Sequence, residues 1–194
     1  MKEYKLIKNL IDSNLADFCY NYILTKRKVV KHLIDTNFIS PIDNEWGKWA
    51  DSQIPNTYSH YADMVMENLL TTIKPKVEKE SGLSLIETYS YVRLYKKGDV
   101  LKKHMDRDAC EISVTLNLGG DPWALCLYPD VQLDLKPVDA VIYKGTKIQH
   151  WREEFTGDIC GQVFLHYNNV NGSLGLSNKY DKRPFLGLPE WFKQ

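Results

Sequence analysis

The chain has 194 residues, with 25 Asp and Glu against 25 Lys and Arg, and 43% of its residues are hydrophobic. These values predict one globular domain over residues 1–194 and exclude a wholly disordered chain. Zero net charge gives no strong nucleic-acid signal, and no apolar run is long enough to cross a bilayer. The four cysteines form no CxxC pair, and the start lacks the apolar core of a secretory signal. We therefore expect a cytoplasmic protein without a membrane partner.

The first part of the chain, about residues 1–82, predicts helices that support the rest. One apolar face at helical spacing, with Asp12 or Ser13 as N-cap, consists of Leu15, Phe18, Cys19, Tyr22 and Ile23. A second helix is predicted over about Thr57–Glu80, where Pro75 should kink or end it and Gly82 should stop it. Its apolar face would contain Tyr58, Ala62, Val65, Leu69, Ile73 and Val77, with Met64 and Met66 as core filler.

From Leu83 the apolar period changes to two, which predicts strands over about residues 83–167. The predicted strands are Leu85–Tyr95, Glu111–Leu118, Trp123–Tyr128, Val131–Leu135, Val138–Tyr143 and Gln162–Tyr167. Short strands at this spacing favour a mainly β barrel or sandwich packed against the helices. Residues 168–194 are predicted to form an arm that docks on the body or on a partner, and a homodimer through this arm is one expectation.

The tripeptide His104-Met105-Asp106 is the main chemical signal. Two side chains placed two residues apart on an extended segment point the same way and can chelate one ion. Two histidines and one carboxylate would fill one face of an octahedral metal and leave three positions open, as in non-haem Fe(II) oxygenases. For the second histidine we favour His150 over His166, which lies within a hydrophobic strand without a preceding turn. His32 and His60 are expected to be structural or solvated.

The surrounding sequence adds specificity to this tripeptide. The run Tyr95–Asp106 resembles the Y-x-x-G-x(5)-H-x-D pattern of prolyl-4-hydroxylase-like 2-oxoglutarate/Fe(II)-dependent dioxygenases. The later run Lys136–Tyr143 resembles the family's G-D-A strand, which leads to the distal histidine. The resemblance covers about residues 85–167 and implies a double-stranded β-helix, or jelly roll, flanked by N-terminal helices.

The resemblance also implies roles for individual residues. His104, Asp106 and His150 match the catalytic iron ligands, and Tyr95 matches a tyrosine that contacts 2-oxoglutarate. The implied enzyme is a hydroxylase that uses Fe(II), 2-oxoglutarate and O₂, with ascorbate as an optional addition. It would oxidise an unactivated C–H bond of a peptide, a protein side chain or a small molecule and release succinate and CO₂.

One position departs from the family pattern. The family places an Arg or Lys nine or ten residues beyond the distal histidine, to pair with the distal carboxylate of 2-oxoglutarate, whereas residues 157–162 read GDICGQ. A buried carboxylate needs a cationic or multiply donating partner. The candidates are Arg152, two residues beyond His150, and then Arg93, two residues before Tyr95. Both are left open here.

Two other functions remain open. An AlkB-like nucleic-acid demethylase would use the same metal ligands on the same fold but would need a basic, aromatic lid. A non-enzymatic cupin-like module that binds a metal or a sugar is supported by the missing basic residue. In the jelly roll of the oxygenase, Ser113, Thr115 and Asn117 would face the interior and line the pocket if Ile112 and its alternating partners face outward, although the two faces could be reversed.

Overall fold

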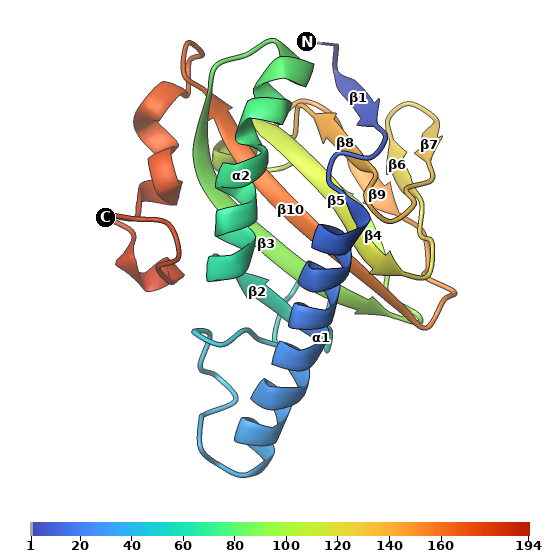
Figure 1. The fold of residues 1–194 in the computed structure, drawn as a ribbon, viewed down its shortest axis with the longest axis vertical. Coiled ribbons are helices and arrows are strands. Elements are labelled where there is room, and N and C mark those ends of the chain that lie inside the picture. The colour runs from blue at the N-terminus through green and yellow to red at the C-terminus, as the bar shows by residue number, and fades with distance from the viewer. Residues whose placement is uncertain (1) are drawn as a thin grey trace.

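The computed structural model describes residues 2–194, which form two antiparallel sheets with two long helices on one side (Figure 1). The larger sheet has the strand order β1-β8-β5-β10-β3-β2. Its strands are β1 (Tyr4–Ile7), β2 (Ser59–Tyr61), β3 (Leu85–Lys96), β5 (Ile112–Gly120), β8 (Ala140–Tyr143) and β10 (Ile159–Asn169). The smaller sheet has the order β4-β9-β6-β7. Its strands are β4 (Leu101–His104), β6 (Leu125–Leu127), β7 (Val131–Leu133) and β9 (His150–Arg152).

The fold is a double-stranded β-helix with N-terminal helices, as the sequence predicted. The helices α1 (Ser13–Asp35) and α2 (Met64–Ser81) cover the outer face of the larger sheet (Figure 1). Val114 and Leu116 of β5 belong to the core that these helices share with the sheet. Ser113 and Thr115 alternate with them and are buried on the opposite face. Of the two orientations that the sequence left open, the structure has the one with the polar residues turned to the interior between the sheets. The expectation that Ser113, Thr115 and Asn117 line the pocket is wrong, because none of the three belongs to the wall of the cavity beside the candidate metal ligands.

The first helix begins where its cap predicts. Asp12 accepts a hydrogen bond from the backbone N–H of Leu15 and is therefore the N-cap. Cys19 and Ile23 are buried, but Phe18 is 60% exposed, so its place on the predicted apolar face is wrong. Neighbouring helix residues are 100° apart around the axis, which puts Phe18 beside the buried stripe and not within it.

The second helix begins later than predicted. The Asp63 carboxylate caps the backbone N–H groups of Val65 and Met66, so the helix starts at Met64, and the preceding residues form the edge strand β2. The predicted start at Thr57 is therefore wrong. Pro75 lies inside the helix and does not end it, whereas Gly82 adopts the left-handed C-cap conformation that the sequence predicted. Met66 is buried, but Met64 is 72% exposed and is not core filler.

Several short strands were not predicted, among them β4 and β9, which the sequence placed in loops. After β10, the C-terminal arm (residues 170–194) continues with the 3₁₀ helices η2 (Gly175–Lys182) and η3 (Glu190–Phe192). Arg183 of this arm forms a buried ion pair with Glu67 of α2, so the arm docks on its own chain. A third 3₁₀ helix, η1 (Asp108–Cys110), precedes β5. No helix among residues 2–194 is both long enough and apolar enough to cross a membrane.

Candidate metal centre

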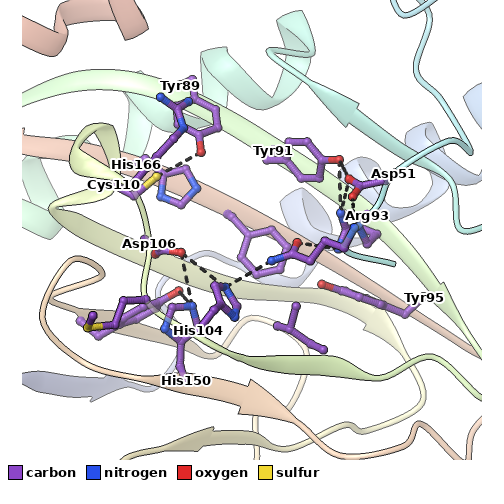
Figure 2. A pocket seen from close by; sticks show the side chains of 16 residues that line it. Asp51, Tyr89, Tyr91, Arg93, Tyr95, His104, Asp106, Cys110, His150 and His166 are labelled. Atoms are coloured by element: carbon purple, nitrogen blue, oxygen red, sulfur yellow. Dashed lines mark hydrogen bonds and ion pairs between the residues drawn. The ribbon is translucent and has the colours of Figure 1, made fainter. Parts of the chain in front are cut away.

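The three predicted metal ligands meet beside a cavity between the sheets (Figure 2). Strands β4 and β9 pair with His104 opposite His150, so the cross-strand register brings the two imidazoles together. Their ring centroids are 4.2 Å apart. Asp106 follows β4, and its Oδ1 lies 3.6 Å from Nε2 of His104 and 3.4 Å from Nε2 of His150. Sequence positions far apart thus supply three ligand atoms around one point.

Backbone carbonyl groups orient both imidazole rings. Nδ1 of His104 lies 2.7 Å from the carbonyl oxygen of Lys102, and Nδ1 of His150 lies 3.1 Å from that of Ile148. A carbonyl oxygen can only accept, so each Nδ1 carries the proton and each Nε2 keeps its lone pair. The lone pairs of both histidines are therefore available on the side where Asp106 lies. Hydrogen bonds of this kind are typical partners of metal-binding histidines.

The electrostatics give the ligands suitable charge states. Burial alone would raise the pKa of Asp106, but the nearby histidine rings, foremost His150, and the hydroxyl of Ser113 outweigh it and lower the pKa to about 2. The Ser113 hydroxyl donates to Oδ2 of Asp106 at 2.9 Å. Burial, together with the neighbouring His150, lowers the pKa of His104. One ionised carboxylate and two imidazoles whose Nε2 atoms face it fit a divalent metal such as Fe(II).

A cavity of about 290 Å³ adjoins these ligands. Its walls include Tyr89, Tyr91, Arg93 and Tyr95 from β3 and His166 from β10, together with Cys110, Asp51 and Gln53. The sequence did not predict the last three as site residues. Asp51 and Gln53 lie in an irregular segment without a hydrophobic period, so no sequence pattern predicted their place at the cavity. They lie at the cavity because Arg93 binds both.

Arg93 is a buried member of the cavity wall. Its Nη2 lies 2.5 Å from Oδ2 of Asp51, and its Nη1 donates to Oε1 of Gln53 at 3.1 Å. Nε of Arg93 has no hydrogen-bond partner within residues 2–194. The amide Nε2 of Gln53 in turn lies 3.3 Å from Nε2 of His104. Arg93 is therefore largely neutralised already, by a carboxylate from a different segment.

Arg152 is also buried, but it does not line the cavity. It donates to the carbonyl oxygen of Trp123 and, at 3.4 Å, to Oε1 of Gln162. Burial lowers the pKa of Arg152. Within residues 2–194 no carboxylate forms an ion pair with it, and its Nε has no hydrogen-bond partner. Arg152 is thus a buried cation held by neutral groups alone.

Tyr95 connects the cavity to Arg152. Its ring lies 4.7 Å from that of Trp123, over which the Arg152 guanidinium stacks at 5.1 Å. The buried Tyr95 hydroxyl also has no partner among the described residues. Arg93, whose guanidinium lies 5.5 Å from the centre of the Tyr95 ring, and Arg152, which stacks on Trp123, thus each have an orphaned Nε, and the Tyr95 hydroxyl lies in the same chain of contacts. Buried donors without acceptors are costly, and an anionic ligand would satisfy them.

The remaining histidines lie outside the group formed by His104, Asp106 and His150. His166 is within reach of Asp106 and Cys110 but not of the other triad members, and its Nδ1 lies 3.0 Å from the Ser113 hydroxyl. Burial lowers the pKa of His166 to about 4, so the ring is neutral. His60 is a buried partner of Asp63, and His32 is exposed on α1. The geometry thus groups His150, and not His166, with the HxD pair.

Comparisons with known proteins agree with this fold. No protein-family model matches the sequence, and no curated protein matches it either. Many solved structures are similar. A Pseudomonas putida prolyl-4-hydroxylase is 13% identical, with 86% of this chain and 92% of that chain covered and a TM-score of 0.56. The 2-oxoglutarate-dependent epimerase SnoN from nogalamycin biosynthesis is 13% identical, with 87% and 78% covered and a TM-score of 0.64.

A third similar structure carries both a metal and 2-oxoglutarate. HygX from Streptomyces hygroscopicus, with nickel and 2-oxoglutarate bound, is 12% identical, with 87% and 84% covered and a TM-score of 0.61. These proteins share a jelly roll but carry out different reactions. At 11–13% identity the likeness concerns architecture. This chain has the jelly-roll fold of the 2-oxoglutarate/Fe(II) oxygenases, as its Tyr95–Asp106 motif predicted.

Proposed function

We propose that the protein is a non-haem Fe(II)- and 2-oxoglutarate-dependent dioxygenase that hydroxylates a peptide, a protein side chain or a small molecule. The observation that carries this proposal is the convergence of two Nε2 lone pairs and one ionised carboxylate beside a cavity. Such a facial triad leaves metal positions open for a co-substrate and O₂. The fold of the similar oxygenases supports the same assignment.

The chain's own residues have distinct parts in this proposal. His104, Asp106 and His150 would hold Fe(II), which together with 2-oxoglutarate and O₂ supplies the oxidation. The carbonyl groups of Lys102 and Ile148 keep the imidazoles in the ligand tautomer. The cavity walls exclude bulk water and place the substrate.

Arg152 is our first choice for the residue that binds the distal carboxylate of 2-oxoglutarate. It has no competing ion pair in the described chain, whereas Arg93 is already paired with Asp51. Strand β9 carries Arg152 on the same face as His150, and Gln162 lies beside it on β10. Its planar fork suits a carboxylate. The free hydroxyl of Tyr95 provides a further donor.

Anaerobic titration of Fe(II) and 2-oxoglutarate tests the proposal directly. A chelated keto acid on Fe(II) should give a weak visible charge-transfer band in the wild-type protein. His150→Ala should lose the band and stoichiometric iron, while His32→Ala, which changes an exposed histidine on α1, should keep both. Loss of iron in His166→Ala but not in His150→Ala would show that the third ligand is misassigned.

The same titration separates an enzyme from a binding module. A wild-type protein that binds Fe(II) but gives no band with 2-oxoglutarate would support a cupin-like metal-binding module. If the band forms, succinate release in the presence of peptide, metabolite and methylated-oligonucleotide libraries would identify the substrate. Turnover with an oligonucleotide alone would favour the demethylase alternative.

A further inference from the structure

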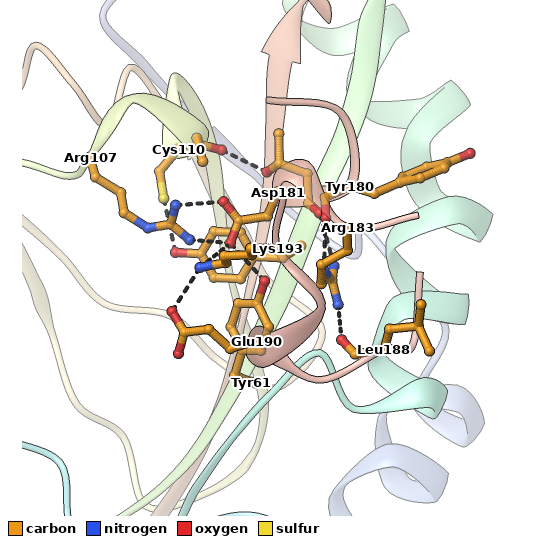
Figure 3. A network of polar contacts seen from close by, with 12 residues as sticks. Tyr61, Arg107, Cys110, Tyr180, Asp181, Arg183, Leu188, Glu190 and Lys193 are labelled. Carbon is orange, nitrogen blue, oxygen red and sulfur yellow. Dashed lines mark hydrogen bonds and ion pairs between the residues drawn. The ribbon is translucent and has the colours of Figure 1, made fainter. Parts of the chain in front are cut away.

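The C-terminal arm reaches the segment that carries Asp106 (Figure 3). Arg107 directly follows this candidate ligand, and its side chain lines the cavity. Its Nη1 and Nη2 lie 2.6 Å from Oδ1 and Oδ2 of Asp181, which makes a bidentate ion pair. On its other side, the guanidinium lies 4.5 Å from the centre of the Tyr89 ring. Arg107 is therefore held from both sides, by the arm and by β3.

Asp181 is itself held firmly. It is 2% exposed and accepts two hydrogen bonds besides those of Arg107. The Tyr61 hydroxyl donates to Oδ2 at 2.6 Å, and Nζ of Lys193 lies 2.9 Å from the same oxygen. A carboxylate with this many charge-assisted and hydroxyl partners has little freedom to rotate. Its geometry is therefore imposed on Arg107.

The backbone at Asp181 is strained. Tyr180, Asp181 and Lys182 have φ values of 51°, 55° and 64°, so three successive non-glycine residues are left-handed. Such a conformation costs free energy and persists only where the surrounding contacts determine it. Arg183 binds Glu67 at 2.7 Å, and its Nε donates to the carbonyl oxygen of Tyr180 at 2.7 Å, so it helps to hold this turn. The strained turn also places the Asp181 carboxylate against Arg107.

We infer that Asp181 is a positioning residue of the candidate active site, which holds Arg107 and thereby fixes the 105–110 segment that carries Asp106. The metal-binding part of this inference rests on the proposed function. Without the ion pair, the Arg107 side chain is released and the segment loosens. Asp106 then loses its place beside the two histidines. Cys110, which is buried at the end of the same segment with its Sγ 3.0 Å from the Tyr89 hydroxyl, becomes accessible.

Thiol labelling of the metal-free protein tests the loosening. Asp181→Asn is compared with Asp139→Asn. The control variant breaks the ion pair of another buried aspartate, Asp139, which lies 2.7 Å from Nζ of Lys8. Iodoacetamide labelling with peptide mapping should show a rise of about tenfold at Cys110 in Asp181→Asn only. Cys19, a buried residue of α1, reports global unfolding, and its labelling rate should not change. An unchanged Cys110 rate, or an equal rise at Cys19, would overturn the inference.

Metal titration tests the consequence for the site. Asp181→Asn should bind Co(II) or Fe(II) about five- to tenfold more weakly than the wild type, and Asp139→Asn should bind them normally. Arg107→Gln should show the same loss, and the double variant should lose no more, because both changes break one interaction. Normal affinity in Asp181→Asn, or losses that add, would contradict a positioning role. Failure of the wild type to bind metal would instead overturn the proposed function, and Cys110 labelling would still decide the role of Asp181.

Discussion

Gly145 lies against the Asp106 carboxylate so closely that residue 145 can carry no side chain. A Cβ built on Gly145 would overlap Oδ2 of Asp106 and the carbonyl oxygen of Cys110, and it would lie 2.7 Å from the Ser113 hydroxyl. The carbonyl oxygen of Gly145 also accepts a hydrogen bond from the backbone N–H of Asp106 at 2.9 Å. The loop after β8 thus fixes the position of the Asp106 carboxylate by close contact and by a backbone hydrogen bond.

Gly145→Ala should therefore damage the site. Because backbone and a short carboxylate must move to admit the methyl group, we expect a loss of about 1–3 kcal/mol in the free energy of unfolding. Metal affinity should fall as Asp106 is displaced. Urea unfolding and a metal titration measure the two effects. Gly172→Ala, where no atom lies nearer than 3.2 Å to the new Cβ, is the matched control. Wild-type affinity in Gly145→Ala would contradict the prediction.

Gln53 should compete with the metal. The single lone pair on Nε2 of His104 accepts from the Gln53 amide at 3.3 Å, so the same lone pair cannot bind a metal at the same time. Gln53→Leu removes the competitor and should tighten metal binding by about two- to fivefold, the worth of one weak hydrogen bond. Isothermal titration with Co(II) checks this. Gln132→Leu, on the exposed part of β7, should leave the affinity unchanged. Weaker binding in Gln53→Leu would show that Gln53 supports the ligand.

Replacing each of two buried arginines by methionine should have different effects on the stability of the fold. Arg183→Met leaves Glu67 as an unpaired buried charge and should cost about 3–5 kcal/mol of stability. Arg152→Met removes a buried cation that has no carboxylate partner in the described chain, so stability should change by less than about 1 kcal/mol or increase. The affinity of the Arg152→Met protein for 2-oxoglutarate should fall by about ten- to a thousandfold. Unfolding curves and calorimetry measure both. If Arg93→Met alone loses 2-oxoglutarate, Arg93 is the anchor.

His166 should make the metal-free protein sensitive to mild acid. Burial lowers the pKa of His166 from an ordinary value of 6.5 to about 4, so the unfolded chain binds the additional proton between these pH values. The free energy of unfolding therefore has its full value above about pH 6.5 and falls by on the order of 3 kcal/mol as the pH approaches 4. The lowered pKa of His104 acts in the same direction. In His166→Asn, the difference between urea unfolding at pH 7 and at pH 4.5 should shrink. An unchanged difference would assign the acid sensitivity to other groups.

The sequence predicted the parts of the fold that have a strong period or motif. The long alternating strands β3 and β5 were found because each presents one apolar face to the helices. The HxD pair was singled out from the run Tyr95–Asp106 and His150 from the run that follows Lys136–Tyr143, and the structure brings the three side chains together. Gly82 was predicted from its capping role. Each of these signals is a pattern within a continuous run of sequence.

The missed features depend on distant partners. Strands β4 and β9 are three or four residues long, too short for a period, and exist because each pairs with the other. Gln53 and Asp51 lie at the cavity because Arg93 binds them. Contacts of this kind cannot be derived from one segment alone. The start of α2 is an exception, because Tyr58 and Ala62 fit a helical face equally well and the deciding signal, the Asp63 cap, is local.

The place of β10 has a consequence for the order in which the protein is made. It is the last strand of the described chain, yet it lies in the middle of the larger sheet, between β3 and β5. A ribosome therefore synthesises His104, Asp106 and His150 before the strand that joins the two halves of this sheet. Asp181 follows later still. The three side chains can take their places around one point only after β10 has been made, and a product cut short before residue 159 would carry all three without the scaffold that brings them together.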